Sequence, residues 1–334
     1  MSDAPPAGKL GRGVKLGLGL AISLLFLYAT FATVPFAKVV DTLASARLPW
    51  VAASIGCIFV AYFLKIYRWA LMLRALGADI TVSQAAAPFL GGVALNNVLP
   101  FRAGDVIRVV AFQRFTGVPP SEQLGTILLE RLLDLFVLMI FLFATVSFWR
   151  ITALDASLLN GAKLAALAVA IAILLFLAAP RPIRLMVGWA QHRFPQLQSA
   201  AEALLRLSNA LSSLSRPPFL LRVTVISILA WLAEGGAYYA VGLALGIAAS
   251  PQAALLAVSI GTLSTIIPSS PGYVGTFHYF TARVAIVFGA STVGATAYAI
   301  LIHALLWLIT TAAGFLLLGL AGDRKRRPLP AAHS

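Results

Sequence analysis

The chain has 334 residues, of which 60% are hydrophobic and only 11% are charged. A soluble domain carries about twice that share of charged residues, so the composition excludes an ordinary soluble protein and indicates an integral membrane protein. The net charge is +14, but the basic residues are scattered at the ends of apolar segments. They therefore indicate positive-inside topology and contact with anionic lipid rather than nucleic-acid binding.

In chain order, the apolar runs approach or exceed the roughly 18 residues that span a bilayer. Residues 1–13 are expected to form a disordered cytoplasmic tail. Residues 14–34 form the first span, which we prefer over a signal peptide because the apolar run is too long for one. A short outside loop follows at 35–49. Further spans are predicted at residues 50–74, 121–149, 162–179, 219–246 and 293–320, before a basic cytoplasmic tail at 321–334.

Residues 181–216 form a basic amphipathic segment between the fourth and fifth predicted spans. One helical face carries Leu197, Ala201, Leu204, Leu211 and Leu214. This pattern is typical of a helix that lies on the membrane surface.

Two shorter apolar stretches repeat each other. Residues 84–104 read QAAAPFLGGVALNNVLPFRAG and residues 252–272 read QAALLAVSIGTLSTIIPSSPG. Placing residue 84 on residue 252 aligns Pro100 with Pro268 and Gly104 with Gly272. The helical part of the first stretch would be about 24 Å long, against a hydrocarbon core of about 30 Å. Both stretches are therefore predicted to be re-entrant hairpins that begin and end on the same side.

The predicted fold is an all-α polytopic membrane protein with about six full spans and two re-entrant hairpins, hence eight or more membrane helices. Both termini and the 181–216 segment then lie in the cytoplasm. Residues 50–149 and 219–320 become inverted copies within one transmembrane domain at 14–320, a recurring plan of transporters. If every hairpin arm spans fully instead, the chain makes about ten crossings with the same termini.

The first repeated stretch is broken near Pro100 and Gly104, and this first break is a candidate head-group site. Proline and glycine free backbone polar groups that must be satisfied by protein or by a water-filled cavity. Helix N-termini and arginines there suit phosphate. The alternative is an interfacial loop with snorkelling arginines. The predicted substrate-binding residues at this break are Asn96, Asn97, Pro100, Arg102, Gly104, Asp105 and Arg108.

Charges also lie within the predicted third span, at Glu130, Arg131 and Asp134. Charges inside a membrane are costly and are functional candidates by default. A substrate path and a structural ion-pair lock are both compatible with them, whereas acid–base catalysis lacks an accompanying metal motif or nucleophile. Glu234 in the fifth span is expected to pair with Arg68 in the second.

The second break is almost neutral. Small and hydroxylated residues there permit close approach of the backbone to a head group, so a shape-forming or gating role is expected. Of the two histidines in this part of the chain, His278 and His303, each is more typical of a buried structural histidine. The candidate residues are Pro268, Ser269, Pro271, Gly272, Gly275 and His278.

Three segments, LNNVLPFRAGDVIR, LLERLLDL and IIPSSPGYVGTFHYF, resemble in order and spacing the transmembrane region of lysylphosphatidylglycerol synthases. This region also occurs alone in flippase-like membrane proteins, and the resemblance covers about residues 14–320. It implies an inner-membrane protein that translocates lipid. In the full-length synthases a separate soluble domain makes the lipid; these residues show no counterpart of that domain, so synthase activity is not expected. The family often has a carboxylate where this chain has His278.

The expected function is therefore a flippase or transporter for a phospholipid or glycolipid-type amphiphile, whose partners are lipids with anionic or glycosylated head groups. The alternatives are a membrane enzyme acting on a lipid head group and an accessory subunit of a lipid-biosynthesis complex. A homo-oligomer or a biosynthetic enzyme is a conceivable protein partner. No Walker motif is present, and Cys57 is the single cysteine. We therefore expect no direct use of ATP, no metal and no cofactor.

Overall fold

The structure is a computed structural model that describes residues 7–32, 34–148, 156–194, 196, 198–247, 250–267 and 269–326. Every regular element within these ranges is helical, as predicted. The elements are α1 (Ala7–Phe31), α2 (Phe36–Ala44), α3 (Leu48–Ala75), α4 (Val82–Val98), η1 (Pro100–Arg102), α5 (Ala103–Ala111), α6 (Gln113–Thr116), α7 (Pro120–Phe148), α8 (Ala156–Ala178), α9 (Pro180–Arg193), α10 (Gln198–Leu214), α11 (Pro217–Ala244), α12 (Pro251–Ser264), η3 (Pro271–Tyr273), α13 (Thr276–Val287) and α14 (Thr292–Arg326).

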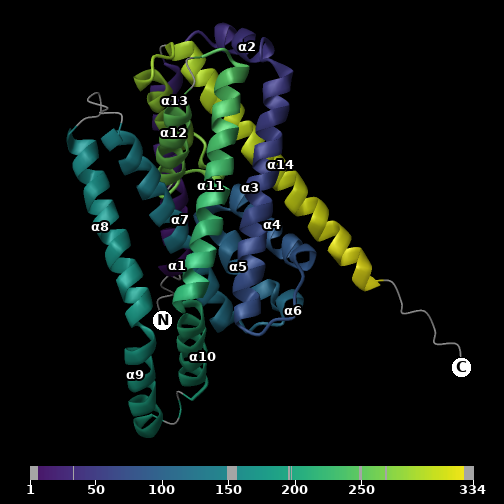
Figure 1. Cartoon of the computed structure of the whole chain (residues 1–334), viewed down its shortest axis with the longest axis vertical. Coiled ribbons are helices and arrows are strands. Elements are labelled where there is room, and N and C mark those ends of the chain that lie inside the picture. The colour runs from purple at the N-terminus through teal and green to yellow at the C-terminus, as the bar shows by residue number, and fades with distance from the viewer. Residues whose placement is uncertain are drawn as a thin grey trace, which may run out of the picture.

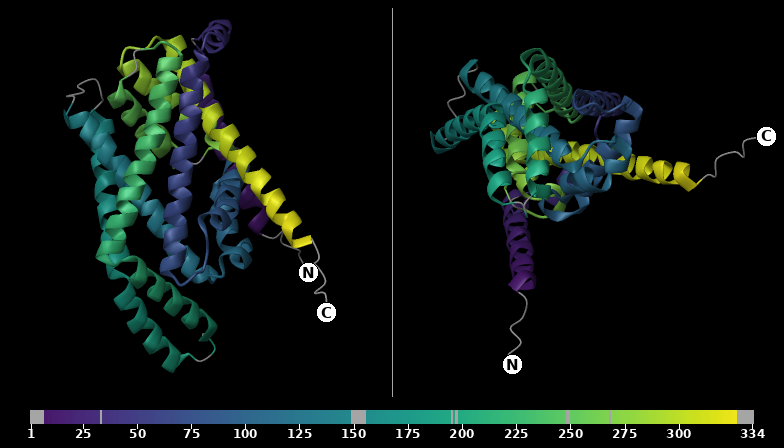
Figure 2. Two further views of the ribbon diagram at one scale, coloured as in Figure 1. Left: turned by 45° about the vertical axis from the view of Figure 1, so that its right-hand side comes forward. Right: turned by 90° about the horizontal axis from the view of Figure 1, so that it is seen from below.

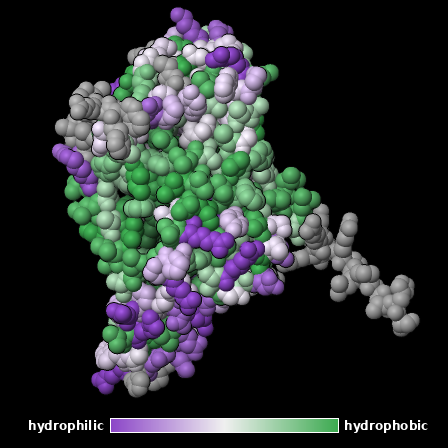
Figure 3. Space-filling model, viewed as in Figure 1, coloured by the Kyte–Doolittle hydropathy of each residue, from purple (hydrophilic) through white to green (hydrophobic). Residues whose placement is uncertain are grey.

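Long apolar helices confirm a multi-pass membrane protein. In the part of the chain that the structure describes, four are long and apolar enough to cross a bilayer: Leu48–Ala75, Asn160–Ala178, Pro217–Ala244 and Thr292–Ala321. A fifth candidate is the pair formed by the end of α1 and by α2, which bends by 80°. Helix α7 has 29 residues, but its embedded charges interrupt the apolar run. Figure 3 shows the apolar residues as a belt, with hydrophilic residues at both ends.

We call the end that carries α9 and α10 the lower end and the end that carries α2 the upper end (Figure 1). Helices α3 and α11 lie side by side at the centre and have the most extensive contact of any helix pair. Small residues permit this approach, because a Cβ atom at Gly236 of α11 would lie 3.3 Å from the sulfur of Cys57 in α3. Close packing through small residues is a common basis of helix association in membranes.

The two predicted broken elements occupy opposite halves of the molecule. Helix α4 runs from the lower end to the middle, and α5 and α6 return towards the lower end; α12 and α13 lie in the upper half (Figures 1 and 2). Caps set where the long arms begin. Thr81 and Gln84 form a reciprocal capping box at α4, and the Ser250 hydroxyl accepts a hydrogen bond from the Ala253 amide at α12.

The two halves exchange contacts. Helix α4, from the broken element of the first half, packs against α14, the last helix of the second half. Helix α12, from the broken element of the second half, packs against α7, the last helix of the first half. The turns of the two elements, η1 and η3, touch each other. The centre of the molecule is therefore built from both stretches of the sequence repeat.

The structure corrects the prediction at the termini and in the loops. Helix α1 begins at Ala7, within the predicted tail, and α14 runs to Arg326, beyond the predicted span. The predicted loop at 35–49 contains the amphipathic helix α2, which buries Val39. Pro268, residues 1–6, residues 327–334 and residue 149 lie outside the described residues.

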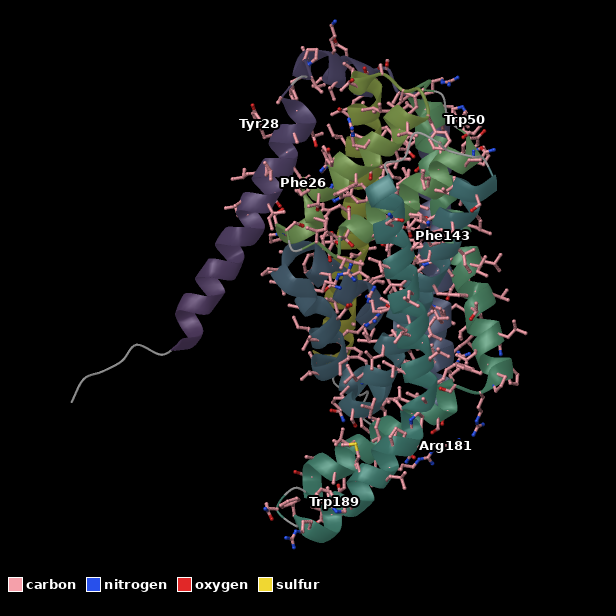
Figure 4. The ribbon with its side chains drawn as sticks, turned by 90° about the vertical axis from the view of Figure 1, so that its left-hand side faces the viewer. Phe26, Tyr28, Trp50, Phe143, Arg181 and Trp189 are labelled. Atoms are coloured by element: carbon pink, nitrogen blue, oxygen red, sulfur yellow. The ribbon has the colours of Figure 1, made fainter. Side chains whose placement is uncertain are left out.

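The segment at 181–216 is two helices rather than one, and it projects from the lower end (Figure 4). Of the predicted apolar face, Ala201, Leu211 and Leu214 are buried, because α10 packs against α7 and α9. Leu204 is 45% exposed, and Leu197 lies outside the described residues. The helical period gave the amphipathic face correctly, but this face of α10 meets protein instead of lipid.

Substituting Gly314 tests the crossing of α14 over α4. A Cβ atom there would collide with the carbonyl oxygen of Leu90 and with Ala94. We expect Gly314→Ala to reduce stability by about 1–3 kcal/mol, as overpacking does, and to lower the thermal unfolding temperature in detergent. Gly319→Ala, on the same helix with open space around it, is the matched control and should not lower that temperature. Equal melting of the two variants would contradict the proposed crossing.

Candidate functional site

A cavity of about 650 Å³ lies where the two broken elements meet. Its walls come from α3, α4, α7, α11, α12, α13 and α14 and from the turns of both broken elements. The structure brings together in this wall most of the residues predicted for the site, namely Asn96, Asn97, Pro100, Arg102, Glu130, Arg131, Asp134, Ser269, Pro271 and Gly272, together with Arg68 and Glu234. Gly104, Asp105, Arg108, Gly275 and His278 are not part of the wall.

One set of buried charges joins α3 to α7 and α11. Lys65 donates a hydrogen bond to Glu234, and Arg68 donates to Asp134 at 2.8 Å and to the Ser227 hydroxyl at 2.7 Å. The indole of Trp231 donates to the same oxygen of Asp134 at 3.0 Å. The predicted pair between Arg68 and Glu234 is therefore wrong. Lys65 lies three residues earlier on the same helical face as Arg68, and it forms the ion pair with Glu234.

A second set joins α5 to α7. One terminal nitrogen of Arg108 lies 3.1 Å from both carboxylate oxygens of Glu130. Arg131 contacts Asp105 at 3.0 Å, Glu130 at 3.3 Å and Asp134 at 3.7 Å. Through Asp134, this second set is continuous with the first, so one charge network runs through the centre of the bundle.

Aromatic rings and an amide hold the network in place. The guanidinium of Arg108 lies 5.0 Å from the ring centre of Trp69 and 4.9 Å from that of Phe89, and Lys65 lies 3.9 Å from the ring of Trp231. Such cation–π contacts stabilise desolvated cations. Asn96 both donates to the Asp105 carboxylate at 2.9 Å and accepts from the Asp105 amide at 3.2 Å. It thereby fastens α4 to α5.

Gly104 and Arg108 are packing residues in this geometry. A Cβ atom at Gly104 would overlap the carbonyl oxygen of Gly92 and lie 2.7 Å from the backbone nitrogen of Asn96. Arg108 is 1% exposed, and its head is engaged by Glu130. Of the arginines predicted to meet phosphate, Arg108 is thus committed to the protein interior, whereas the Arg131 side chain is 35% exposed.

Arg102 differs from the other cations of the cavity. No carboxylate lies within salt-bridge distance of it among the described residues. Its guanidinium donates to the Thr265 hydroxyl at 2.8 Å and lies 5.7 Å from the ring centre of Tyr273. In the described part of the chain, Arg102 (φ 52°) and Tyr273 (φ 60°) are the two non-glycine residues with positive φ. Such strain clusters at functional sites, and here the two strained residues touch across the two breaks.

The second break is held by α1 and α14. The Ser23 hydroxyl of α1 accepts a hydrogen bond from the Ser270 amide at 2.7 Å. Gly272 (φ 71°) has no room for a Cβ atom, which would lie 3.0 Å from the Trp307 indole and 3.2 Å from the carbonyl of Asn97. Asn97 in turn donates to the hydroxyls of Thr310 and Thr311 on α14.

The two histidines form a pair behind the cavity wall. His278 accepts a hydrogen bond from the Gly275 amide at 3.3 Å, and its other ring nitrogen lies 3.1 Å from His303, which lines the cavity. A Cβ atom at Gly275 (φ 98°) would lie 2.5 Å from the Ser23 carbonyl oxygen of α1, so a larger residue does not fit there. Within the described residues, no group of three or more His, Cys, Asp or Glu comes together as a metal site would require.

Sequence reasoning missed several residues of the cavity wall: Tyr62, Lys65, Trp231, Trp307 and Thr310. The helical spacing of Lys65 to Arg68 was a usable signal for Lys65. The aromatic residues carried no such signal, because an aromatic residue in a span is ordinarily a packing residue.

Two comparisons with known proteins bear on the chain. The family model described as "Lysylphosphatidylglycerol synthase TM region" matches residues 17–314. A curated relative, named glycosyltransferase AglD, from Haloferax volcanii, is 25% identical over 348 aligned residues, which cover 92% of this chain and 54% of that protein. The chain therefore spans about half the length of this relative.

The pair of Lys65 and Glu234 is suited to a double-mutant cycle. Breaking a buried ion pair on one side typically costs about 3–5 kcal/mol, because the remaining charge is left uncompensated. We expect Lys65→Met and Glu234→Gln each to lower the thermal unfolding temperature in detergent strongly, and the double variant to recover most of the loss. Additive losses in the double variant would contradict the pairing.

Proposed function

The chain belongs to the family of the lysylphosphatidylglycerol synthase transmembrane region, and on that premise we propose that it is a flippase-type transporter that moves a phospholipid or glycolipid-type amphiphile between leaflets. The observation that carries the proposal is the cavity of about 650 Å³ at the meeting point of the two broken elements. Ligand sites typically measure about 300–1,000 Å³, which fits a lipid head group. Broken helices that flank a central site are a recurring feature of transporters.

In this proposal the head group passes through the polar cavity while the acyl chains stay in the surrounding lipid. Arg102 and the partly exposed Arg131 contact the head group from the first half of the chain, and Ser269 and Ser270 contact it from the second. The other charges of the network, including Arg108 with Glu130, hold the walls in register. In this proposal, Arg131 is the member of the charge network that contacts substrate, and the other ion pairs, such as Arg108 with Glu130, have a structural role.

The proposed topology is an inverted repeat with six spans, α1, α3, α7, α8, α11 and α14, and two re-entrant hairpins, formed by α4 with α5 and by α12 with α13. The reciprocal packing of α4 on α14 and of α12 on α7 supports the repeat, because a two-fold relation between the halves would generate both contacts. The lower end is the cytoplasmic side of an inner membrane, since α9 lies there (Figure 1) and carries Arg181, Arg184 and Arg193.

A membrane enzyme is the second candidate, and the printed name of the relative, a glycosyltransferase, favours it. Acid–base or nucleophilic work would require a carboxylate free to react. In the central network, Asp105, Glu130, Asp134 and Glu234 each contact a cation. This engagement supports transport over catalysis as the primary proposal. An accessory role in a lipid-biosynthesis complex, through α9 and α10, is a further alternative.

Reconstitution into liposomes tests the transport proposal. We expect the chain to move fluorescent phospholipids between leaflets faster than empty liposomes do, as measured by dithionite bleaching of the outer-leaflet dye. Arg131→Gln should slow this movement about tenfold, the effect of losing roughly 1.4 kcal/mol of interaction.

Arg206→Gln is the matched control, because Arg206 is an exposed arginine of α10 that pairs only with Glu202. It should leave the rate unchanged. Folded wild-type protein that moves neither anionic, neutral nor glycosylated lipid would rule out the transport proposal. Transfer of sugar from an activated donor to a lipid in the same liposomes would favour the enzyme instead.

Cysteine labelling tests the proposed topology. In a Cys57→Ser background, Ser45→Cys places a thiol at the upper end, and Asn209→Cys places one on the exposed side of α10 at the lower end. We expect a membrane-impermeant maleimide to label the upper position in intact spheroplasts and the lower one only after lysis. The reverse pattern, or labelling of both positions in intact spheroplasts, would refute the assignment.

A further inference from the structure

Arg102 leaves the cavity with a surplus positive charge. The charged residues of the wall are the cations Lys65, Arg68, Arg102 and Arg131 and the carboxylates Glu130, Asp134 and Glu234. Directly behind the wall, Arg108 and Asp105 add one charge of each sign. With the histidines neutral, the balance is one cation more than the carboxylates can match, and Arg102 is the cation without a carboxylate among the described residues.

Arg102 is half-buried in the cavity wall, so its charge is only partly hydrated. Buried charges require a partner or a pKa shift, and an arginine stays protonated under all ordinary conditions. The Thr265 hydroxyl and the Tyr273 ring give Arg102 neutral partners only. The backbone of Arg102 is also in the left-handed region, at φ 52°. This backbone conformation costs free energy for a residue other than glycine.

The surroundings supply the rest of an oxyanion site. The hydroxyl-bearing residues Ser269 and Ser270 line the same cavity as Arg102, and both come from the second half of the chain. Hydroxyl groups and a guanidinium together form the usual donor set for phosphate oxygens. The donors would therefore reach the anion from both broken elements at once.

We infer that the cavity holds an anion site at the junction of the two broken elements, centred on Arg102, that takes one negative charge in the form of a phosphodiester head group. A single charge neutralises the surplus. A zwitterionic head group would add a cation to a site that is already positive, and a second negative charge would exceed the surplus of one cation. The inference rests on the proposed lipid transport and names its substrate class.

Equilibrium binding to the purified full chain in non-ionic detergent tests the inference without requiring transport. Trp231 and Trp307 line the cavity, so tryptophan fluorescence reports on ligand there. We expect dihexanoylphosphatidylglycerol, with one net negative charge, to bind about tenfold tighter than zwitterionic dihexanoylphosphatidylcholine, a difference typical of one charge-assisted hydrogen bond. Dihexanoylphosphatidic acid at pH 9 should bind no tighter than phosphatidylglycerol.

Two variants move the affinity in opposite directions. Arg102→Asn removes the charge while keeping a residue that tolerates the left-handed backbone; it should weaken phosphatidylglycerol binding about tenfold and abolish most of the preference over phosphatidylcholine. Thr265→Val removes the hydroxyl that competes for the guanidinium and should tighten phosphatidylglycerol binding. Arg102→Lys should keep the preference for the anion. Arg222→Gln, which loses only an exposed contact with the Tyr67 hydroxyl, should change neither affinity.

Several outcomes would overturn the inference. Equal affinity for the two head groups in the wild type would do so, as would unchanged phosphatidylglycerol binding in an Arg102→Asn variant that melts normally. Tighter binding of phosphatidic acid would refute the single charge. Glycerol 3-phosphate that binds as tightly as the lipid would show a site for soluble phosphate. In liposomes, equal movement of both lipids would refute the charge class while transport stands, whereas movement of neither would refute transport itself.

Discussion

The structure depends on one electrostatic constraint: charges placed inside an apolar bundle must compensate one another there. The desolvation of an ion costs several kcal/mol and is offset only by a well-placed partner. The network from Lys65 to Arg108 meets this requirement with contacts among α3, α5, α7 and α11. The relative rotation of these helices is therefore fixed by charge as well as by packing. This arrangement of the helices also determines the shape of the cavity beside the network.

The two broken elements achieve similar positions by different means. The first is fastened through polar side chains, above all the reciprocal bonds between Asn96 and Asp105. The second is fastened through glycine and through neighbouring helices. In Figure 4, Phe26 lies on the side of α1 that faces the bundle and Tyr28 on the outer side. Phe26 packs against Tyr279 and Phe280 of α13. One element is thus rigid by internal bonding, while the other is shaped by what lies next to it.

The all-helical class and the long apolar helices followed from the sequence, because apolar length is a local signal. The charged candidates were conspicuous for the same reason: a charge within an apolar run stands out. The choice of partners was not predictable. Whether Glu234 meets Lys65 or Arg68 depends on less than one turn of relative helix rotation, which no local pattern encodes. The contact of Arg102 with Tyr273 joins positions far apart in the chain. Similarly, the period of α10 defines an apolar face but does not say whether that face meets lipid or protein.

The separation of the ion-pair partners along the chain has a consequence for biogenesis. Lys65 is synthesised 169 residues before Glu234, and Arg68 is synthesised 66 residues before Asp134. When α3 leaves the ribosome, the carboxylates that pair with its cations have not yet been synthesised. At that stage α3 therefore carries uncompensated charges, which are costly in a bilayer. Arg68 can therefore meet its carboxylate only after α7 has been synthesised, and Lys65 only after α11. The central pair of α3 and α11 thus joins an early helix of the chain to a much later one.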